Sequence, residues 1–400
     1  MIESQTKLSI FNEYQNRSNP FRKHGARFYR DLDSLFFLKS KNNRLCVCII
    51  FAKRPVLILV SMSKKVNLKT IANHLNLSPG TVSRVLNGKA KEFRISQETV
   101  KLVLAYVEKI GYSPNLIAKG LRASKTFTIG LIIPDISNPF FAIMARNIEN
   151  AASKENYSIL LVDSQDDEQR EKQQLRNMIS RKVDGIIAAP VGASYQHFLE
   201  IKNQGIPLVF VDRYFNDIDI PYVSSDNYSG AFEATKYLMN NGHQNIVLIK
   251  GDEATEPAKE RKRGYMDALI QEGISIDEIG VTGSNEFSIE NGYQSTKDML
   301  AGDIKPTAIF ALSNLIGLGV LKAVKEAGIK IPDNLSLLTF DDQPYVPFLD
   351  PPVTTVKQDS EKIGILAMEY IISRIDKEKT PLKSKLIPTT LMVRKSVLKR

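Results

Sequence analysis

Apolar residues follow two different spacings along the chain of 400 residues, and the spacing changes near residue 126. Between residues 68 and 110 they recur every three or four positions, which is the period of amphipathic helices. After residue 126 they form short continuous runs that alternate with helical stretches. This pattern predicts a small all-α region followed by a larger α/β region.

The all-α region opens with two short helices joined by a tight turn. The first helix carries its apolar residues on one face, at Leu68, Ile71, Ala72 and Leu75. The second is expected over residues 79 to 87. Ser78 is a favourable N-cap for it, and Pro79 takes the first helical position, where no backbone N–H is needed.

The second helix keeps its apolar residues for the core and turns small polar side chains and one arginine outward. Its core residues are Val82, Val85 and Leu86. In a helix-turn-helix, the second helix lies in the major groove of DNA. Three outward side chains suit phosphate contacts: Thr81, Ser83 and Asn87. Arg84 can bond a guanine edge with two hydrogen bonds. The alternative is a helical hairpin of any small all-α domain, with solvated outward residues.

A third helix and a short hinge segment complete this region. Ser96 is its expected N-cap, and Gly111 follows its end. Its apolar residues at helical spacing are Val100, Val103, Leu104 and Val107. Residues 112 to 122 are too few for a stable isolated helix and contain Gly120, so we expect them to be ordered mainly when something holds them.

Charge is distributed unevenly between the two regions. The net charge of the chain is +10, to which residues 63 to 125 contribute +9 and residues 1 to 62 contribute +7. Residues 126 to 400 carry −6. Because the positive excess includes the helix-turn-helix segment, it indicates a protein that meets nucleic acid with one end.

The α/β region reads as a doubly wound fold with parallel sheets, because continuous apolar strands alternate with crossover helices. The expected strands cover residues 129–133, 158–162, 185–189, 207–211, 245–249, 308–312 and 336–340. Ligands in such folds lie beyond the carboxyl ends of the strands. Polar residues cluster at several of these ends, at Asp135, Asn138, Asp212, Arg213, Ser313, Asn314, Asp341 and Asp342. Together with aromatic faces, such groups suit sugar hydroxyls and rings.

Residues 1 to 62 match neither region. Two apolar runs, at residues 45–52 and 56–60, are interrupted by a charged pair and Pro55, which argues against a membrane span, and the long polar stretch before them argues against a signal peptide. A real appendage, a degenerate anchor and upstream sequence translated only in the gene model remain open. We favour the last and expect the remaining regions to fold without this segment.

At the motif level, the all-α region and hinge resemble the LacI/GalR family of bacterial transcriptional repressors. The matching motifs are Leu68-Lys-Thr-Ile-Ala72, Leu77-Ser78, Thr81 to Asn87, and Gly111-Tyr112-x-Pro114-Asn115-x-x-Ala118-x-x-Leu121. The resemblance implies that hinge helices of two subunits pair in the minor groove, with Leu121 as a wedge between base pairs. The expected DNA-binding residues are Thr70, Ser78, Pro79, Gly80, Thr81, Ser83, Arg84, Asn87, Tyr112, Asn115, Ala118, Leu121 and Arg122.

The chain departs from the family in two places within the head. Pro79 and Gly80 stand where the family often has larger side chains, which leaves Arg84 and the hinge as the main candidates for direct base readout. The loop from Gly88 to Arg94 is longer than is usual in the family. Its Lys89, Lys91 and Arg94 are candidates for additional phosphate contacts.

The resemblance continues through residues 126 to 397. It implies a two-lobed domain like periplasmic sugar-binding proteins, with an effector in the cleft between the lobes, and a homodimer. By position, the expected effector-binding residues are Phe140, Phe141, Asp212, Arg261, Phe287, Asn314 and Asp341. Asp226 and His243 are expected to hold the fold. Thr255 stands near the position of a basic residue in purine-binding members, which favours a carbohydrate over a purine.

The sequence therefore predicts four segments. They are an extension over residues 1–62, a DNA-binding head over 63–110, a hinge over 111–126, and an effector-binding and dimerisation domain over 127–400. The expected function is cytoplasmic, nucleoid-associated transcriptional regulation, with double-stranded operator DNA and a small carbohydrate as partners. No cofactor, metal or membrane is expected. Cys46 and Cys48 offer no metal-ligand spacing.

Two other classes of function fit the sequence less well. A sugar-binding transport component would explain residues 126 onward but needs a secretion signal and has no use for the helix-turn-helix. An enzyme would need a catalytic constellation, and the sequence shows neither a Ser-His-acid nor a paired-carboxylate signature.

Replacing Leu121 by Ala is expected to weaken operator binding, because the wedge that opens the base step is lost. Folded stability and effector affinity should stay nearly unchanged. Binding to operator DNA, thermal unfolding and effector titration of the variant measure the three properties. An unchanged operator affinity would rule out the wedge role.

Overall fold

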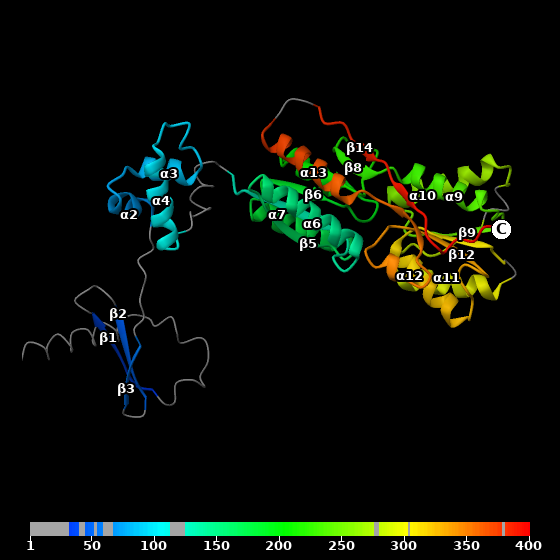
Figure 1. The fold of residues 1–400 in the computed structure, drawn as a ribbon, viewed down its shortest axis with the longest axis horizontal. Helices are drawn as coiled ribbons and strands as arrows, with labels where there is room; N and C mark the ends of the chain where they lie inside the picture. The colour runs from blue at the N-terminus through cyan, green and yellow to red at the C-terminus, as the bar shows by residue number, and fades with distance from the viewer. Residues whose placement is uncertain are drawn as a thin grey trace, which may run out of the picture. The chain divides into compact units, whose positions relative to one another are not determined.

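The computed structural model describes residues 32–39, 45–51, 54–58, 67–112, 125–275, 280–302, 305–377 and 381–400 (Figure 1). The chain divides into two compact units, residues 1–114 and 115–400. Most of the predicted hinge lies outside the described residues, including four candidate DNA-binding residues, Asn115, Ala118, Leu121 and Arg122.

The N-terminal segment contains an antiparallel sheet of three strands in the order β1-β2-β3. The strands are β1 (Leu32–Lys39), β2 (Leu45–Phe51) and β3 (Arg54–Ile58). β2 covers nearly all of the first apolar run, and β3 overlaps the second but begins two residues before it, at Arg54. β1 was not predicted, because its residues show no regular alternation. Pro55 lies in an edge strand opposite Ile50, where a residue without an N–H is tolerated.

Three helices form the head: α2 (Leu68–His74), α3 (Pro79–Leu86) and α4 (Gln97–Lys109). The predicted N-caps are confirmed, since Ser78 Oγ accepts from Thr81 N at 3.0 Å and Ser96 Oγ accepts from Thr99 N at 3.2 Å. Gly111, with a φ of +61°, follows the C-cap of α4, as expected.

The core of the head is small and comes from all three helices. Its buried residues are Ile71, Ala72, Val82, Val85 and Val103. One prediction was wrong: Leu104 is 49% exposed, although its spacing placed it on the apolar face of α4. The face that packs on α2 and α3 is centred on Val103, and two short helices cannot cover Leu104 as well.

The first lobe of the larger unit is built on a six-stranded sheet in the order β14-β8-β7-β6-β4-β5. Its strands are β4 (Thr128–Ile133), β5 (Ser158–Asp163), β6 (Gly185–Ala188), β7 (Leu208–Val211), β8 (Tyr222–Ser225) and β14 (Lys385–Ile387). All pairings in this sheet are parallel. Helices α6 (Pro139–Lys154) and α13 (Ser360–Ile375) share one apolar core with it, and α7 (Glu168–Ser180) and α8 (Gln196–Asn203) share another.

The second lobe repeats this plan with a sheet in the order β10-β9-β11-β12-β13-β15. Its strands are β9 (Ile246–Ile249), β10 (Gly280–Thr282), β11 (Ala308–Ala311), β12 (Ser336–Phe340), β13 (Thr354–Lys357) and β15 (Thr390–Met392). Only β15 runs antiparallel in this sheet. Helices α9 (Asn227–Asn240) and α10 (Glu256–Gln271) cover one face, and α11 (Ile289–Ala301) and α12 (Asn314–Glu326) cover the other (Figure 1).

Alternate residues of one strand serve the two faces of each sheet. In β4, Ile129, Leu131 and Ile133 pack toward α6, whereas Ile132 packs toward α7. Burial on both sides explains why the strands read as continuous apolar runs. All seven predicted strands of this region are confirmed. β8, β10, β13, β14 and β15 were not predicted, since none of them is a continuous apolar run of four or more residues.

The chain crosses between the lobes three times, after β8, after β13 and after β14. The crossings are bonded to one another. Ser225 Oγ donates to Gln358 Oε1 at 2.6 Å, and Asp226 N donates to Ile387 O at 2.8 Å. Among the described residues, no helix is long and apolar enough to cross a membrane.

The backbones of α11 and α12 approach closely where two glycines face the partner helix. A Cβ on Gly292 would lie 2.1 Å from Ile316 O, and a Cβ on Gly319 would lie 2.1 Å from Ile289 O. Any larger side chain must therefore push the helices apart.

Replacing Gly292 by Ala is expected to lower the free energy of unfolding by about 1–3 kcal/mol, because the methyl group overpacks this crossing. Urea denaturation followed by circular dichroism measures the loss. Gly302→Ala at the end of the same helix is the control, since a Cβ there meets nothing nearer than 3.5 Å. Equal midpoints for the two variants would contradict the prediction.

Candidate functional site

The outer face of α3 carries the polar residues that the sequence singled out. Ser78 and Thr81 bond each other through their hydroxyls at 2.9 Å. Asn87 donates its side-chain amide to Ser83 O at 2.7 Å, so it closes the end of the helix. The exposed members of the predicted set on α3 and its N-cap are Ser78, Pro79, Gly80, Arg84 and Asn87, and Thr81 and Ser83 are half-buried. The helix thus presents a surface without bulky side chains around one arginine.

The other two described candidates lie at the borders of the head. Thr70 donates its hydroxyl to Asn67 Oδ1 at 3.1 Å, within the N-cap of α2. Tyr112 is half-buried against the core of the head, directly before the hinge segment.

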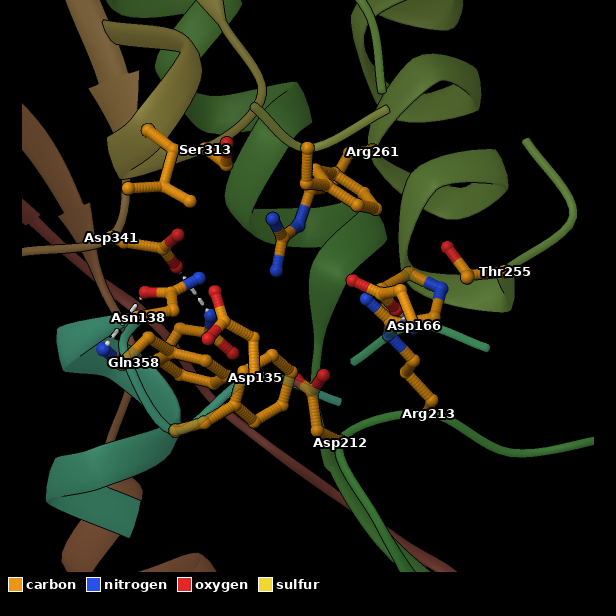
Figure 2. A pocket seen from close by; sticks show the side chains of 15 residues that line it. Asp135, Asn138, Asp166, Asp212, Arg213, Thr255, Arg261, Ser313, Asp341 and Gln358 are labelled. Atoms are coloured by element: carbon orange, nitrogen blue, oxygen red, sulfur yellow. Dashed lines mark hydrogen bonds and ion pairs between the residues drawn. The ribbon is translucent and has the colours of Figure 1, made fainter. Parts of the chain in front are cut away.

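A polar cleft lies between the two lobes of the larger unit and encloses about 480 Å³, including its mouth (Figure 2). The residues that line it come from strand ends and helix starts of both lobes. They are Asp135, Asn138, Phe140, Phe141, Asp166, Asp212, Arg213, Thr255, Pro257, Arg261, Phe287, Ser313, Leu315, Asp341 and Gln358. Six of the seven predicted effector residues are among them.

The seventh, Asn314, is buried beside the cleft. Its Nδ2 donates to Asn138 Oδ1 at 3.0 Å, which joins the two lobes directly. Its Oδ1 is buried without a hydrogen-bond partner. Asn138 also caps α6, since the same Oδ1 accepts from Phe140 N at 3.1 Å. Asn314 therefore lies where the lobes meet.

Asp212 is a buried carboxylate at the end of β7 and 4% exposed. Its Oδ1 has no hydrogen-bond partner, and its φ of +59° is a left-handed conformation. Burial raises the pKa of this carboxyl to about 6, while the charges of Arg261 and Arg213 lower it. A buried acceptor without a partner is costly, and a donor from a bound molecule would satisfy it.

Arg261 in α10 is held rigidly at the opposite side of the cleft. Its Nε donates to Asn227 Oδ1 at 2.8 Å and its Nη1 to Leu312 O at 2.7 Å. Its guanidinium carbon lies 3.7 Å from the centre of the Phe340 ring. Burial lowers the pKa of Arg261, and the charges of Asp341 and Asp212 oppose this shift. The side chain is thus a fixed donor.

Asp341 follows β12 and connects the cleft to the crossings. Its Oδ1 accepts from Gln358 Nε2 at 2.6 Å (Figure 2). Its Oδ2 accepts from Asn314 N at 3.2 Å. Gln358 in turn accepts from Ser225, which stands at another crossing. A contact with Asp341 therefore acts on two of the three strands that join the lobes.

Aromatic rings from both lobes supply flat surfaces in the cleft. Phe140 and Phe141 begin α6 and contact each other edge to face, with ring centres 5.0 Å apart. Phe287 comes from the second lobe, and its ring packs on Gly251, where a Cβ would lie 2.4 Å from the ring. Glycine at position 251 is therefore needed for this ring position.

Arg213 lies near the rings of both lobes. Its guanidinium carbon is 5.6 Å from the centre of Phe141 and 5.8 Å from that of Phe287. Its Nη1 donates to Asp166 Oδ1 at 2.6 Å (Figure 2). This ion pair closes one side of the cleft.

Several residues that line the cleft were not among the predicted effector-binding residues. Asn138 and Arg213 stood among the polar residues at the strand ends, and Gln358 directly follows β13. Asp166 carried no signal, because it lies three residues beyond its strand in a turn with a positive φ. Asp226 and His243 hold the fold, as expected. Asp226 caps α9, and His243 Nε2 donates to Leu398 O at 3.0 Å.

Taken together, the cleft offers carboxylate and amide oxygens at its edges, two guanidinium groups and three aromatic faces. This set matches a small polyhydroxylated ring, whose hydroxyls donate to carboxylates and whose apolar faces stack on aromatic rings.

Both the head and the two-lobed domain match models of known protein families. The model for bacterial regulatory proteins of the lacI family matches residues 67–115, and the model for periplasmic binding proteins and the sugar binding domain of the LacI family matches residues 126–395. The catabolite control protein A of Priestia megaterium is 34% identical over 78% of this chain and 93% of its own. The ribose operon repressor of Halalkalibacterium halodurans is 33% identical over 82% of this chain and 96% of its own.

Among solved structures, a LacI family transcriptional regulator from Enterococcus faecium with bound ribose is 29% identical. The match covers 68% of this chain and 99% of the Enterococcus faecium chain, with a TM-score of 0.62. The family models together span both the helix-turn-helix and the two lobes. The chain belongs to the LacI family of bacterial regulatory proteins, whose members are transcriptional regulators.

Proposed function

We propose that this protein is a sequence-specific transcriptional repressor whose affinity for operator DNA is controlled by a sugar bound between its lobes. The observation that carries the proposal is the joint presence of two sites in one chain. One is the polar face of α3 on a basic head, and the other is the cleft with its unsatisfied Asp212. A regulator needs both, because one binds the signal and the other binds the DNA.

The DNA-binding residues that we propose are the described candidates of the head together with the hinge residues named from the sequence. Ser78, Thr81, Ser83 and Asn87 suit phosphate contacts, which fix the position of α3 on the duplex. Arg84 suits a guanine edge. Because this contact set is largely electrostatic, the affinity for DNA should fall steeply with salt.

The proposed effector is an uncharged sugar. The cleft contains four carboxylates, Asp135, Asp166, Asp212 and Asp341, against two guanidinium groups, so a phosphorylated sugar would meet an excess of negative charge. The cleft size and its stacking rings suit a single ring. Ribose is the first candidate, because one relative binds ribose and another is named as a ribose operon repressor.

The proposed coupling runs through the crossings between the lobes. A sugar that bonds Asp341 contacts the group that holds Gln358, and Gln358 holds Ser225 at a second crossing. A change in lobe orientation then alters the hinge segments of the two subunits. By linkage, sugar and DNA change each other's affinity by the same factor.

We further propose that the protein acts as a homodimer in the bacterial cytoplasm, at the nucleoid, and that it catalyses no reaction. The family supports the regulatory role, and the residues that line the cleft include no histidine, cysteine or lysine. A sugar-binding transport component is the second candidate, supported by the two-lobed domain alone. The helix-turn-helix match argues against it.

The first test is fluorescence anisotropy of the full chain on genomic fragments that it enriches, compared with a scrambled duplex at one fixed salt concentration. We expect specific binding that ribose or another single sugar shifts by roughly 5- to 150-fold, and the direction of the shift identifies inducer or co-repressor. Equal affinity for the scrambled duplex would contradict the regulator proposal. Specific binding untouched by any uncharged sugar would contradict the proposed effector.

Replacing Asp212 by Asn tests the cleft separately from the head. Sugar affinity should fall by roughly 10- to 100-fold, since a hydrogen bond to a charged acceptor is lost. DNA binding without sugar should persist. Isothermal titration with ribose, or with the sugar identified above, measures the first effect, and anisotropy measures the second.

The same variant should be more stable than the natural protein at neutral pH. Because burial raises the pKa of Asp212 from 3.8 to about 6, the folded state binds this proton more tightly than the unfolded state. The natural protein therefore loses stability as the pH rises through 6, and asparagine avoids this loss. The gain should be at most about 3 kcal/mol above pH 6 and vanish below about pH 4.

Asp342→Asn is the matched control for Asp212→Asn. Asp342 Oδ1 accepts from Arg394 Nη2 at 2.7 Å and from Thr355 Oγ1 at 2.7 Å, outside the sugar cleft. This variant should lose stability and keep its sugar affinity. If Asp212→Asn left the sugar affinity unchanged, the role assigned to Asp212 would be wrong.

A further inference from the structure

Phe93 is a large apolar side chain that is 42% exposed on the small head. It lies in the loop between α3 and α4, which the sequence marks as longer than is usual in the family. The guanidinium carbon of Arg84 lies 4.0 Å from the centre of the Phe93 ring. An exposed aromatic ring is thus in contact with the arginine that is the best candidate for base readout.

The loop holds Phe93 in a defined place. Phe93 N donates to Lys89 O at 3.2 Å, and Lys89 N donates to Arg84 O at 2.9 Å. Ile95 N donates to Ala90 O at 2.9 Å, and both side chains pack on the core of the head. Backbone bonds therefore tie Phe93 to the residue whose side chain it contacts.

The acidic residue of the loop, Glu92, does not form an ion pair with Arg84. Its Oε2 lies 3.8 Å from Nζ of Lys89, three residues earlier in the loop. In the part of the chain that the structure describes, no carboxylate lies within ion-pair distance of Arg84. The aromatic ring is the contact that orients this side chain.

Stacking and base readout use different parts of a guanidinium group. The flat face of the group contacts an aromatic ring, whereas its N–H donors point outward in the plane. An arginine held over Phe93 therefore keeps its in-plane donors for the two acceptors of a guanine edge.

We propose that Phe93 is a positioning residue that holds Arg84 ready for base readout by the recognition helix α3. This inference rests on the proposed function, since it concerns binding to operator DNA. An arginine that is already oriented loses less side-chain freedom on binding, and the gain appears as affinity for the matching base. The longer loop thus contributes to base readout indirectly, because its Phe93 orients Arg84.

The size of the effect follows from the strength of a cation–π contact at an exposed site. Loss of the ring should weaken operator binding by roughly 2- to 5-fold. Loss of Arg84 should weaken it by roughly 5-fold or more, since a bidentate contact to a base is removed. Binding to non-specific DNA should not change when Phe93 is altered, because the ring carries no charge.

The test is a double-mutant cycle in the full chain, measured by anisotropy on the enriched operator and on a scrambled duplex. The variants are Phe93→Ala, Phe93→Leu, Phe93→Tyr, Arg84→Ala, and Arg84→Ala combined with Phe93→Ala. Leu104→Ala is the control, since it removes another exposed apolar side chain of the head. Circular dichroism with heating shows that each variant is folded.

We expect Phe93→Ala and Phe93→Leu to weaken operator binding equally, while Phe93→Tyr and Leu104→Ala keep it. With Arg84 already replaced, Phe93→Ala should have no further effect. A full effect of Phe93→Ala in that background, or natural affinity of Phe93→Leu, would overturn the positioning role and leave the regulator proposal intact. A natural protein that does not distinguish operator from scrambled duplex would overturn the regulator proposal and this inference with it.

Discussion

The hydrogen bond between Asp341 and Gln358 is the interaction on which the larger unit depends. It joins the end of a central strand of the second lobe to a crossing between the lobes, and a second bond carries the connection on to Ser225. The bond between Asn138 and Asn314 also joins the lobes, but the bond from Asp341 ties a carboxylate of the cleft to the crossings. With it, the site that faces the ligand and the strands that set the lobe orientation are one network.

Two carboxylate residues at strand ends of the cleft hold unusual backbone conformations. Asp212 and Asp341 both have positive φ values, of 59° and 74°, and stand at corresponding strand ends in the two lobes. Such conformations cost energy in residues other than glycine, and they persist where the surrounding structure fixes them. In both cases the turn directs a carboxylate into the cleft, so each lobe contributes one such acceptor to the site.

The sequence predicted the parts of this protein that rest on local rules. Helix caps such as Ser78 and Ser96 have a short-range chemistry, and the seven predicted strands are continuous apolar runs. Strands such as β8 and β13 were not predicted, because half or more of their residues are polar and they form no continuous apolar run. The exposure of Leu104 and the position of Asp166 in the cleft depend on which elements pack nearby. The sequence of a single segment does not show which elements these are. The contact between Phe93 and Arg84 joins a loop to a helix, and no local sequence pattern indicates it.

The direct contact between the lobes has a consequence for how the protein responds to its surroundings. Asn138 and Asn314 meet through neutral amides, so neither acidity nor dissolved ions changes the attraction between them. The head, in contrast, carries its function on positive charge. Ionic strength is therefore expected to weaken DNA binding by the head, whereas this one contact between the lobes is insensitive to salt.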